Sequence, residues 1–400
     1  MRPGQSREYA ALLLPCLQRG PVAALAFASG MACAQPAITA ANNPVDVDVA
    51  EALQRIKLPR GFAISLFAQG MEEARSLALG DDGTLYVGTR GAQGAPAIGK
   101  VYAIPDADGD GRGDQVITIL EGLNYPNGVA FHAGDLYVAE LGRILKYEDI
   151  AGRLLDMPEP SILADQLPED YHHGWKFIGI GPDDKLYVPV GAPCNVCEPD
   201  SSHGLILRMD LDGSNPETFA KGVRNTVGFD WEPTTRQFWF TDNGRDLWGN
   251  DRPPEELNHA PVAGLHFGFP YRYGKDLVDA EFPTALADSA FTPAVLELPA
   301  HNAGLGIEFY TGTQFPAEYR GQLFAAYHGS WNRNPIDGYR LRLVRFEKGR
   351  AVGYEDFATG WLEDNTYWGR PVDVEQAPDG SLLVSDDHNG VIYRISYEGN

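Results

Sequence analysis

The chain has 400 residues, of which 44% are hydrophobic and 22% charged, and its formal net charge at pH 7 is −23. This balance is typical of a globular protein. Because so acidic a chain repels nucleic-acid phosphates, the charge argues against a protein that binds DNA or RNA.

The first 34 residues have the pattern of a secretory signal. Three arginines precede the apolar run PVAALAFASGMACA, which ends in Ala32-Cys33-Ala34. A basic start, an apolar stretch and an A-x-A site are the parts of a cleavable signal, and the run is short for a membrane span. We therefore expect a periplasmic or secreted protein without a transmembrane span. Cys33 as a lipoprotein cysteine is the less favoured alternative.

Residues 35–57 are mostly small and polar, and they are expected to form a loose leader. A single apolar strand follows at 58–68, LPRGFAISLFA, without a hairpin partner of its own. From residue 76 onward, one unit recurs: two apolar strands around a Gly/Pro/Asp turn, as in FIGIGPDDKLYVPVG at 177–191. Such units are typical of β-hairpins.

Six copies of this unit predict a ring of blades. Their second strands lie at Tyr86, Tyr137, Tyr187, Trp239, Phe324 and Leu383, and a third apolar run follows each hairpin. Repeats of about 40–50 residues with several strands each are typical of β-propellers. We predict an all-β, six-bladed propeller over residues 58–400, in which the strand at 58–68 completes the last blade. A solenoid is the alternative, but neither end has a polar capping repeat.

Polar and basic residues gather at one end of the predicted ring. The start of a hairpin's first strand and the end of its second strand share one end, because the strands are antiparallel. These positions include Arg75, Arg90, Asn127, His172, His173, Asn195, Arg224, Asn225, Asn243, His301, His328, Arg333, Arg370 and the run 386–389. Any one of them is ordinary in a loop, but their presence in every blade predicts an anion-binding site at this mouth.

Two further segments carry candidate chemistry. Cys194 and Cys197 stand in CNVCE, where Glu198 replaces the histidine of a haem-attachment motif. Two cysteines cannot complete a zinc site, so a local disulfide is favoured in an exported protein. The acidic run 106–114, DADGDGRGD, has EF-hand-like spacing, but Ile117 stands at position 12. A solvated turn is favoured there, and weak calcium binding stays open.

Several motifs together resemble a known enzyme family. They are LYVGTR, PNGVAF, HHGWKF, GPDDKLYVPVGAPCNVCE, GVRNTVGFDW, WFTDNGRD, FGFPY, HGSWNR and GRPVDV. As a set they resemble the sorbosone dehydrogenase-like branch of the pyrroloquinoline quinone (PQQ) sugar dehydrogenases, which also include soluble aldose dehydrogenases and a fungal pyranose dehydrogenase domain. The resemblance implies a PQQ- and calcium-dependent oxidation of a sugar or related aldehyde, with electrons passed to an external cytochrome or quinone.

The resemblance also implies roles for individual residues. His173 would remove the substrate hydroxyl proton as a general base, and the backbone carbonyls of Gly244 and Arg245 would bind calcium. The expected cofactor-binding residues are Arg90, Lys176, Arg224, Asn225, His301, His328, Arg333 and Arg370. Successive residues on an extended segment point to opposite sides, so we expect only His173, and not His172, to face the cofactor.

Two departures leave the sugar open. Val372 stands where the aldose enzymes have a second arginine, and His172 stands where an acidic residue precedes the base. Two rival interpretations remain. One is a calcium-dependent lactonase of the gluconolactonase type, which needs acidic side chains converging on a metal near the axis. The other is a non-catalytic propeller that binds carbohydrate or protein.

Overall fold

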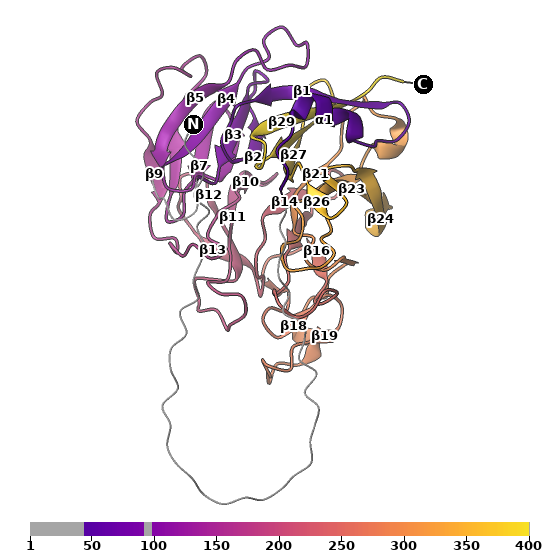
Figure 1. Cartoon of the computed structure of the whole chain (residues 1–400). Coiled ribbons are helices and arrows are strands. Elements are labelled where there is room, and N and C mark those ends of the chain that lie inside the picture. The colour runs from indigo at the N-terminus through magenta and orange to yellow at the C-terminus, as the bar shows by residue number, and fades with distance from the viewer. Residues whose placement is uncertain (1–43, 92–97, 400) are drawn as a thin grey trace, which may run out of the picture. The chain divides into compact units, whose positions relative to one another are not determined.

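The computed structural model describes residues 44–91 and 98–399 (Figure 1). The predicted signal, Cys33 and the first part of the predicted leader lie outside the described residues. Six sheets, each with four antiparallel strands, are the blades of a β-propeller. One of these sheets has a fifth strand that pairs in parallel, and another takes its outer strand from the start of the described chain. The predicted fold is confirmed.

Each of the first three blades is built from consecutive strands. Blade 1 contains β2 (Ala74–Leu79), β3 (Leu85–Thr89), β4 (Gly99–Ile104) and β5 (Ile117–Leu123). Blade 2 contains β6 (Gly128–His132), β7 (Asp135–Ala139), β8 (Ile144–Tyr147) and β9 (Ser161–Ala164). Blade 3 contains β10 (Gly179–Ile180), β11 (Lys185–Val190), β12 (Leu205–Asp210) and β13 (Glu217–Lys221).

The other three blades include insertions or a distant strand. Blade 4 contains β14 (Gly228–Trp231), β15 (Phe238–Asp242), β16 (Glu255–Ala260) and β20 (Leu296–Leu298). Blade 5 contains β21 (Gly304–Phe309), β22 (Leu323–Tyr327), β23 (Arg340–Glu347) and β24 (Arg350–Ala358), with a 3-10 turn at Ala317–Tyr319. Blade 6 contains β27 (Pro371–Gln376), β28 (Leu382–Asp386), β29 (Val391–Tyr397) and β1 (Phe62–Gln69).

Strand β1 closes the ring as predicted. It pairs antiparallel with β29, from Phe62 opposite Tyr397 to Gln69 opposite Val391. The strand begins at Phe62 rather than at residue 58, because Pro59 has no N–H to donate and Gly61 has a φ of +87°. The Phe62 ring lies 4.8 to 5.1 Å from the rings of Phe315, Tyr319, Phe357 and Tyr397. This aromatic cluster anchors the first strand to the last two blades.

The middle strands of the blades are buried on both faces, which is why they appear as continuous apolar runs. Every residue of β3, β15, β22 and β28 is buried. Among the described residues, the six largest apolar clusters lie one at each blade-to-blade contact. A closed ring gives every blade a neighbour on both sides, so no blade leaves an apolar face in water.

Blade 4 carries an insertion that explains the long spacing between the fourth and fifth repeats. Residues 261–293 contain β17 (Leu265–His266), β18 (Arg272–Tyr273), β19 (Leu277–Val278) and a 3-10 turn at Asp288–Ala290. β17 pairs in parallel with β13, the outer strand of blade 3. The insertion therefore covers a sheet edge that would otherwise expose unpaired backbone groups.

The end of the predicted loose leader is packed against the ring. It contains α1 (Val49–Ala52) and a 3-10 turn at Leu53–Arg55. Val45 donates a backbone hydrogen bond to Tyr367, which belongs to a small hairpin of β25 (Leu362–Glu363) and β26 (Thr366–Tyr367). Ala52 is only 1% exposed within the core cluster of the last two blades. The expectation of a loose leader was therefore wrong for residues 44–57, because their apolar side chains pack against the core of the last two blades.

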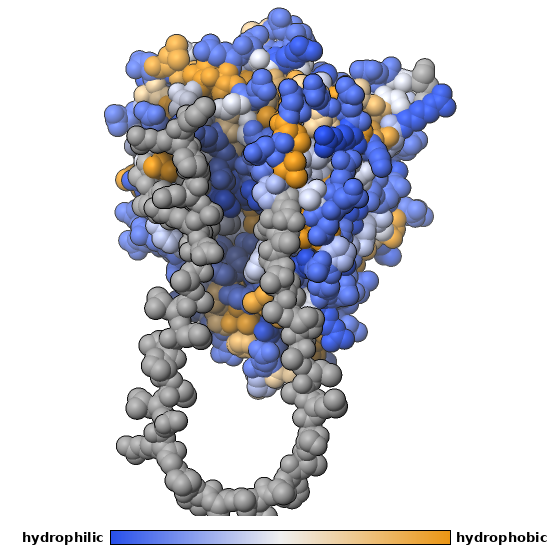
Figure 2. All heavy atoms as spheres, viewed as in Figure 1, coloured by the Kyte–Doolittle hydropathy of each residue, from blue (hydrophilic) through white to orange (hydrophobic). Residues whose placement is uncertain are grey.

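Large apolar side chains reach the surface as separate patches among hydrophilic residues (Figure 2). The most exposed are Leu155 and Leu247, at 87% and 63%. No helix among the described residues has the length and hydropathy to cross a membrane.

Candidate active site

The mouth residues of all six blades are joined by hydrogen bonds. Arg75 of blade 1 contacts Asp387 of blade 6 at 2.7 Å and Asn127 of blade 2 at 2.7 Å, and Asn127 donates to the Lys176 carbonyl before blade 3 at 3.0 Å. Three more contacts join the remaining neighbouring blades around the mouth. They are Arg224 to Asn195 between blades 4 and 3, Asn332 to Asp246 between blades 5 and 4, and His328 to Asp387 between blades 5 and 6. The prediction that these residues share one end of the ring is confirmed.

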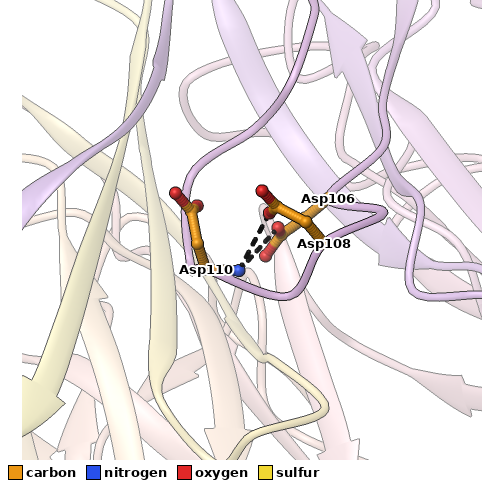
Figure 3. A group of neighbouring side chains, drawn as sticks. All are labelled: Asp106, Asp108 and Asp110. Carbon is orange, nitrogen blue, oxygen red and sulfur yellow. Dashed lines mark hydrogen bonds between the residues drawn. The ribbon is translucent and has the colours of Figure 1, made fainter.

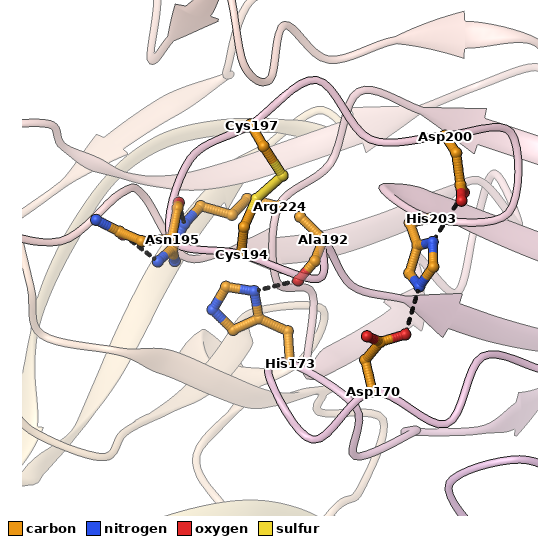
Figure 4. Close-up of a disulfide and its surroundings, with 9 residues drawn as sticks. All are labelled: Asp170, His173, Ala192, Cys194, Asn195, Cys197, Asp200, His203 and Arg224. Carbon is orange, nitrogen blue, oxygen red and sulfur yellow. Dashed lines mark hydrogen bonds and ion pairs between the residues drawn. A yellow bond between two sulfur atoms is a disulfide. The ribbon is translucent and has the colours of Figure 1, made fainter.

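His173 lies in the segment before blade 3, next to the loop between β11 and β12. Its Nδ1 is 2.9 Å from the carbonyl oxygen of Ala192 (Figure 4). A carbonyl only accepts, so Nδ1 carries the proton and Nε2 keeps its lone pair. Burial lowers the pKa of His173 well below its usual value, and Arg224 and His172 lower it further. The ring is therefore a neutral imidazole whose Nε2 has no hydrogen-bond partner among the described residues.

The expectation that His172 and His173 point to opposite sides was wrong. The segment turns at this point instead of extending, since His173 has a φ of +53°. The two ring centroids are 4.1 Å apart. His172 is exposed, whereas His173 is partly buried. Both rings consequently belong to the mouth, with His172 at the rim and His173 below it.

Lys176 holds the turn that carries these histidines. The residue is 1% exposed, and its Nζ donates to the carbonyls of Gly174 at 2.7 Å and Pro168 at 3.1 Å. Burial lowers the pKa of Lys176 to about 8. Both of these hydrogen bonds go to backbone carbonyls, so Lys176 stabilises the turn. Its role as a cofactor ligand stays a prediction.

Arg224 is the centre of a second hydrogen-bond group, in the segment before β14. Its guanidinium donates to both oxygens of Asn195, to the Asn243 carbonyl at 3.0 Å and to Asp246 Oδ2 at 2.8 Å. Its side chain is 3% exposed. The neighbouring Asn225 donates its backbone N–H to Asp242 and is partly exposed. Arg224 therefore holds the loops that carry Asn195, Asn243 and Asp246 together. Direct contact with a cofactor stays a prediction for both Arg224 and Asn225.

Gly244 and Arg245 offer two adjacent carbonyl groups. Within the described ranges, neither carbonyl oxygen accepts a hydrogen bond. Asn243 is 6% exposed, and its buried Oδ1 also lacks a partner in the described chain. Gly244 must be glycine here, because a Cβ would lie 2.5 Å from Pro253. Calcium prefers uncharged and charged oxygen ligands of this kind, so these residues fit the calcium ion that the resemblance implies.

Asp387 gathers the basic residues of blades 1, 5 and 6. Its carboxylate accepts from Arg75, from Arg370 Nε at 2.6 Å and from His328 Nε2 at 3.0 Å. Burial by itself raises the pKa of Asp387, but the hydrogen bond from His328 and the charges of Arg370 and Arg75 outweigh it and hold that pKa well below its usual value. Burial lowers the pKa of His328 to about 4. His328 is therefore neutral, and two guanidinium groups face one carboxylate.

The guanidinium groups of Arg75, Arg90 and Arg370 suit an anionic cofactor such as PQQ. Trp175 lies beneath Arg75 and Arg90, whose guanidinium carbons are 5.7 and 5.0 Å from its ring centroid. Arg90 also pairs with Glu73 at 3.2 Å. The buried Nε1 of Trp175 has no hydrogen-bond partner among the residues described, which leaves one N–H donor for a ligand. Planar guanidinium groups suit carboxylate and quinone oxygens.

The remaining two predicted cofactor residues contact the loop after β15. His301 Nε2 lies 2.7 Å from the Gly249 carbonyl, and Arg333 Nη1 donates to the Asn250 carbonyl at 2.6 Å. Arg333 also pairs with Asp251 at 3.0 Å. Both side chains join blade 5 to blade 4, and their contact with a cofactor stays a prediction.

Asp246 and Trp175 were not predicted as site residues, and Asp387 was predicted only as part of the mouth run 386–389. Asp246 follows the mouth residues after β15, and Trp175 lies between His173 and Lys176. Position alone therefore pointed to them. What the sequence did not show was that each would be the partner of basic side chains from other blades.

The axis below the mouth has a different character. Val227, Leu305 and Val372 form a small apolar cluster at the starts of three inner strands. Beyond it, the inner strands line a cavity of about 220 Å³ that contains Asp230, Glu308, Asp373 and Glu375. Val372 thus takes part in an apolar plug where a second arginine would stand in the aldose enzymes.

The axial carboxylates do not converge as a metal-dependent lactonase requires. In the described ranges, the single group of three acidic or histidine side chains with ligand atoms within 4.8 Å of one another is Asp106, Asp108 and Asp110 (Figure 3). This group lies in the exposed loop between β4 and β5, at the end of these strands that is opposite to the mouth. Backbone amides of Asp110 and Gly111 donate into it. The predicted solvated turn is present, and calcium binding there stays a prediction.

The predicted disulfide is also present. Cys194 and Cys197 are bonded in the loop between β11 and β12, beside His173 (Figure 4). The loop is joined to the preceding segment by His203, whose ring nitrogens lie 3.0 Å from Asp170 and 2.8 Å from Asp200. The disulfide is therefore part of the wall of the candidate site.

Residues 48–395 match the sequence model of a family described as a domain of unknown function, DUF7133. The chain belongs to this family. An uncharacterized protein of Borreliella burgdorferi is 33% identical to it over 369 residues, which cover 88% of this chain and 94% of the relative. Membership of the DUF7133 family therefore extends across the whole propeller, but it assigns no chemistry.

Solved structures with the same fold have low sequence identity to this DUF7133 chain. The calcium structure of a Trichoderma reesei carbohydrate-active enzyme of family AA12 gives a TM-score of 0.74 at 20% identity, covering 89% of this chain and 99% of that one. The holo PQQ domain of a Coprinopsis cinerea pyranose dehydrogenase gives 0.71 at 19% identity, covering 85% and 97%. The PQQ-bound aldose sugar dehydrogenase of Streptomyces coelicolor gives 0.60 at 20% identity, covering 85% and 99%. These likenesses show the fold.

Proposed function

We propose that this protein is a PQQ- and calcium-dependent dehydrogenase that oxidises a sugar or a related aldose or aldehyde. The observation that carries the proposal is the state of His173, a neutral imidazole with Nε2 free as a proton acceptor. It shares the mouth of the ring with the guanidinium groups of Arg75 and Arg370, which flank the Asp387 carboxylate. The names of the similar structures, which include PQQ-bound and calcium forms, agree with this chemistry.

The chain's own residues have separate tasks in this proposal. His173 Nε2 accepts the proton of the substrate hydroxyl, and Ala192 keeps the ring in the tautomer that allows it. Bound PQQ would accept the hydride, with calcium polarising its quinone. The carbonyls of Gly244 and Arg245, together with Asn243 Oδ1, are suited to hold the calcium. Arg75, Arg370 and Trp175 are suited to hold the anionic cofactor.

Two further parts of the proposal rest on the sequence. We propose export to the periplasm or the outside of the cell, supported by the pattern of residues 1–34 and by a disulfide that persists in oxidising compartments. The electrons would then pass to a separate acceptor, a cytochrome or a quinone, because the sequence has no C-x-x-C-H site for an attached haem.

The proposal is tested first by binding. Purified protein is titrated with PQQ in the presence of calcium by calorimetry, and the complex is then assayed by dye reduction with a panel of sugars. We expect calcium-dependent binding and activity with at least one sugar. Absence of PQQ binding would overturn the cofactor assignment, and binding without dye reduction by any sugar or aldehyde would overturn the substrate class.

The role of the base is tested by a matched pair of variants. His173→Ala should lower kcat by roughly 100-fold or more, the usual size of a general-base effect, with PQQ affinity little changed. His172→Ala should act mainly on KM, since His172 is exposed at the rim. Because the base must be neutral and burial lowers its pKa, kcat/KM should remain high until the pH falls well below 6.5. A His173→Ala enzyme with normal kcat beside an inactive His172→Ala enzyme would reverse the assignment.

A further inference from the structure

Asn195 lies between the two cysteines of the disulfide and contacts two elements of blade 4 at once. Its Oδ1 accepts from Arg224 Nη2 at 2.9 Å and from the Asp246 backbone N–H at 2.7 Å. Its Nδ2 donates to the Asp246 carbonyl at 3.1 Å, and its own carbonyl accepts from Arg224 Nε at 2.8 Å. A single side chain thus holds both peptide groups of Asp246.

The peptide group between Arg245 and Asp246 carries a candidate calcium ligand, the Arg245 carbonyl oxygen. The Asp246 N–H and the Arg245 carbonyl belong to the same planar peptide unit, in which N–H and C=O point in opposite directions. When Asn195 Oδ1 accepts the N–H, the Arg245 carbonyl is directed away from the disulfide loop. That carbonyl oxygen accepts no hydrogen bond from any described residue, so its orientation depends on the bond at the other side of the peptide.

The disulfide fixes the position of Asn195. The bond joins Cys194 to Cys197, and Cys194 and Val196 pack against Ala192, Phe269 and Tyr273. A ring closed over so few residues restricts the unfolded chain less than a long one does. Its main effect is therefore local, on the loop that presents Asn195. Both cysteines are partly exposed, so a small dithiol can reach them.

We propose that Asn195, held by the Cys194–Cys197 disulfide, is the positioning residue of the calcium site, so that the affinity for calcium depends on the redox state of this disulfide. The inference rests on the proposed function. Reduction by a dithiol transfers two electrons: the S–S bond breaks, each sulfur ends with one proton, and the dithiol closes to a cyclic disulfide. The freed loop no longer fixes the Arg245 peptide group.

The test measures calcium affinity rather than turnover. Calcium is titrated into the full-length protein with excess PQQ, and the absorbance of PQQ reports complex formation. Asn195→Ala removes the acceptor of the Asp246 N–H, and we expect the half-saturating calcium concentration to rise by about 10- to 100-fold, as for other residues that orient metal ligands. Asn195→Asp keeps that acceptor and loses the Nδ2 donor, so it should stay close to wild type.

A matched control and a redox arm separate this effect from general destabilisation. Asn215→Ala loses a side-chain bond of similar kind, from Nδ2 to Asp210, in an exposed turn of the same blade, and should leave the calcium affinity unchanged. Wild-type protein that is reduced with dithiothreitol, and freed of it before PQQ is added because a dithiol also reduces the quinone, should bind calcium as weakly as Cys194→Ser/Cys197→Ser does. The same treatment should have no further effect on that double variant, which controls for Cys16 and Cys33.

Three outcomes have different meanings. If the wild type shows no calcium-dependent PQQ binding, the proposed function fails, and this inference fails with it. If the wild type binds calcium but Asn195→Ala or reduction leaves the affinity unchanged, only this inference is overturned. If the cysteine double variant does not fold, as judged by urea unfolding, the oxidised Asn195→Ala and Asn195→Asp pair decides alone.

Discussion

The carboxylates of the axial cavity should make the protein less stable as the pH rises. Burial raises the pKa of Asp230 to about 7 and that of Asp373 to about 7, against about 3.9 for an aspartate in an unfolded chain. The folded state therefore binds protons more tightly than the unfolded state. By linkage, the free energy of unfolding falls between about pH 4 and pH 7 and levels off above that range.

The size of the effect follows from the shift of Asp230. Between pH 5 and pH 8 a carboxyl of this pKa loses its proton in the folded state, while the unfolded state is ionised throughout. The loss is roughly two pKa units at about 1.4 kcal/mol each, or about 3 kcal/mol. Because Asp230 lines a cavity of about 220 Å³ that has room for water, we expect about 2 kcal/mol.

The assay compares Asp230→Asn with the wild type by urea unfolding at pH 5 and pH 8, followed by tryptophan fluorescence. Asp230 also accepts the backbone N–H of Phe309 at 2.6 Å, so the variant loses some stability at every pH. The informative quantity is the difference between the two pH values, which should shrink by about 2 kcal/mol in the variant. Asp184→Asn, on an exposed turn, is the control and should leave the difference as in wild type. An unchanged difference in Asp230→Asn would refute the argument.

Two further predictions concern stability. Asp387→Ala leaves the buried Arg75 and the partly buried Arg370 without their shared carboxylate, and it should lower the free energy of unfolding by about 3–5 kcal/mol. A loss below 1 kcal/mol in urea unfolding would show that the two guanidinium groups find other partners. Phe62→Ala removes the centre of the aromatic cluster that fixes β1, and it should cost about 3 kcal/mol in the same assay; unchanged stability would mean that β1 does not hold the ring closed.

Much of the fold could be predicted because its signals are local. A hairpin is specified by alternating apolar residues and a turn sequence, and six copies of it imply a ring. The isolated strand at β1 and the single cysteine pair were similarly informative, since each had one obvious partner. Where local signals conflicted with packing, prediction failed. The leader at 44–57 looked polar, but its few apolar residues dock on the last blades.

The sequence also determined which residues line the mouth, because the ends of antiparallel strands fix their location. The tertiary structure alone decided how these residues pair. Arg75 and Asp387 are 312 residues apart and form a contact of 2.7 Å, and no pattern in either segment indicates the other. The turn at His173 likewise depends on Ala192 and Lys176 from its surroundings. Hydrogen bonds between side chains depend on the relative positions and orientations of the two groups, and for residues of different blades these are fixed only when the ring closes.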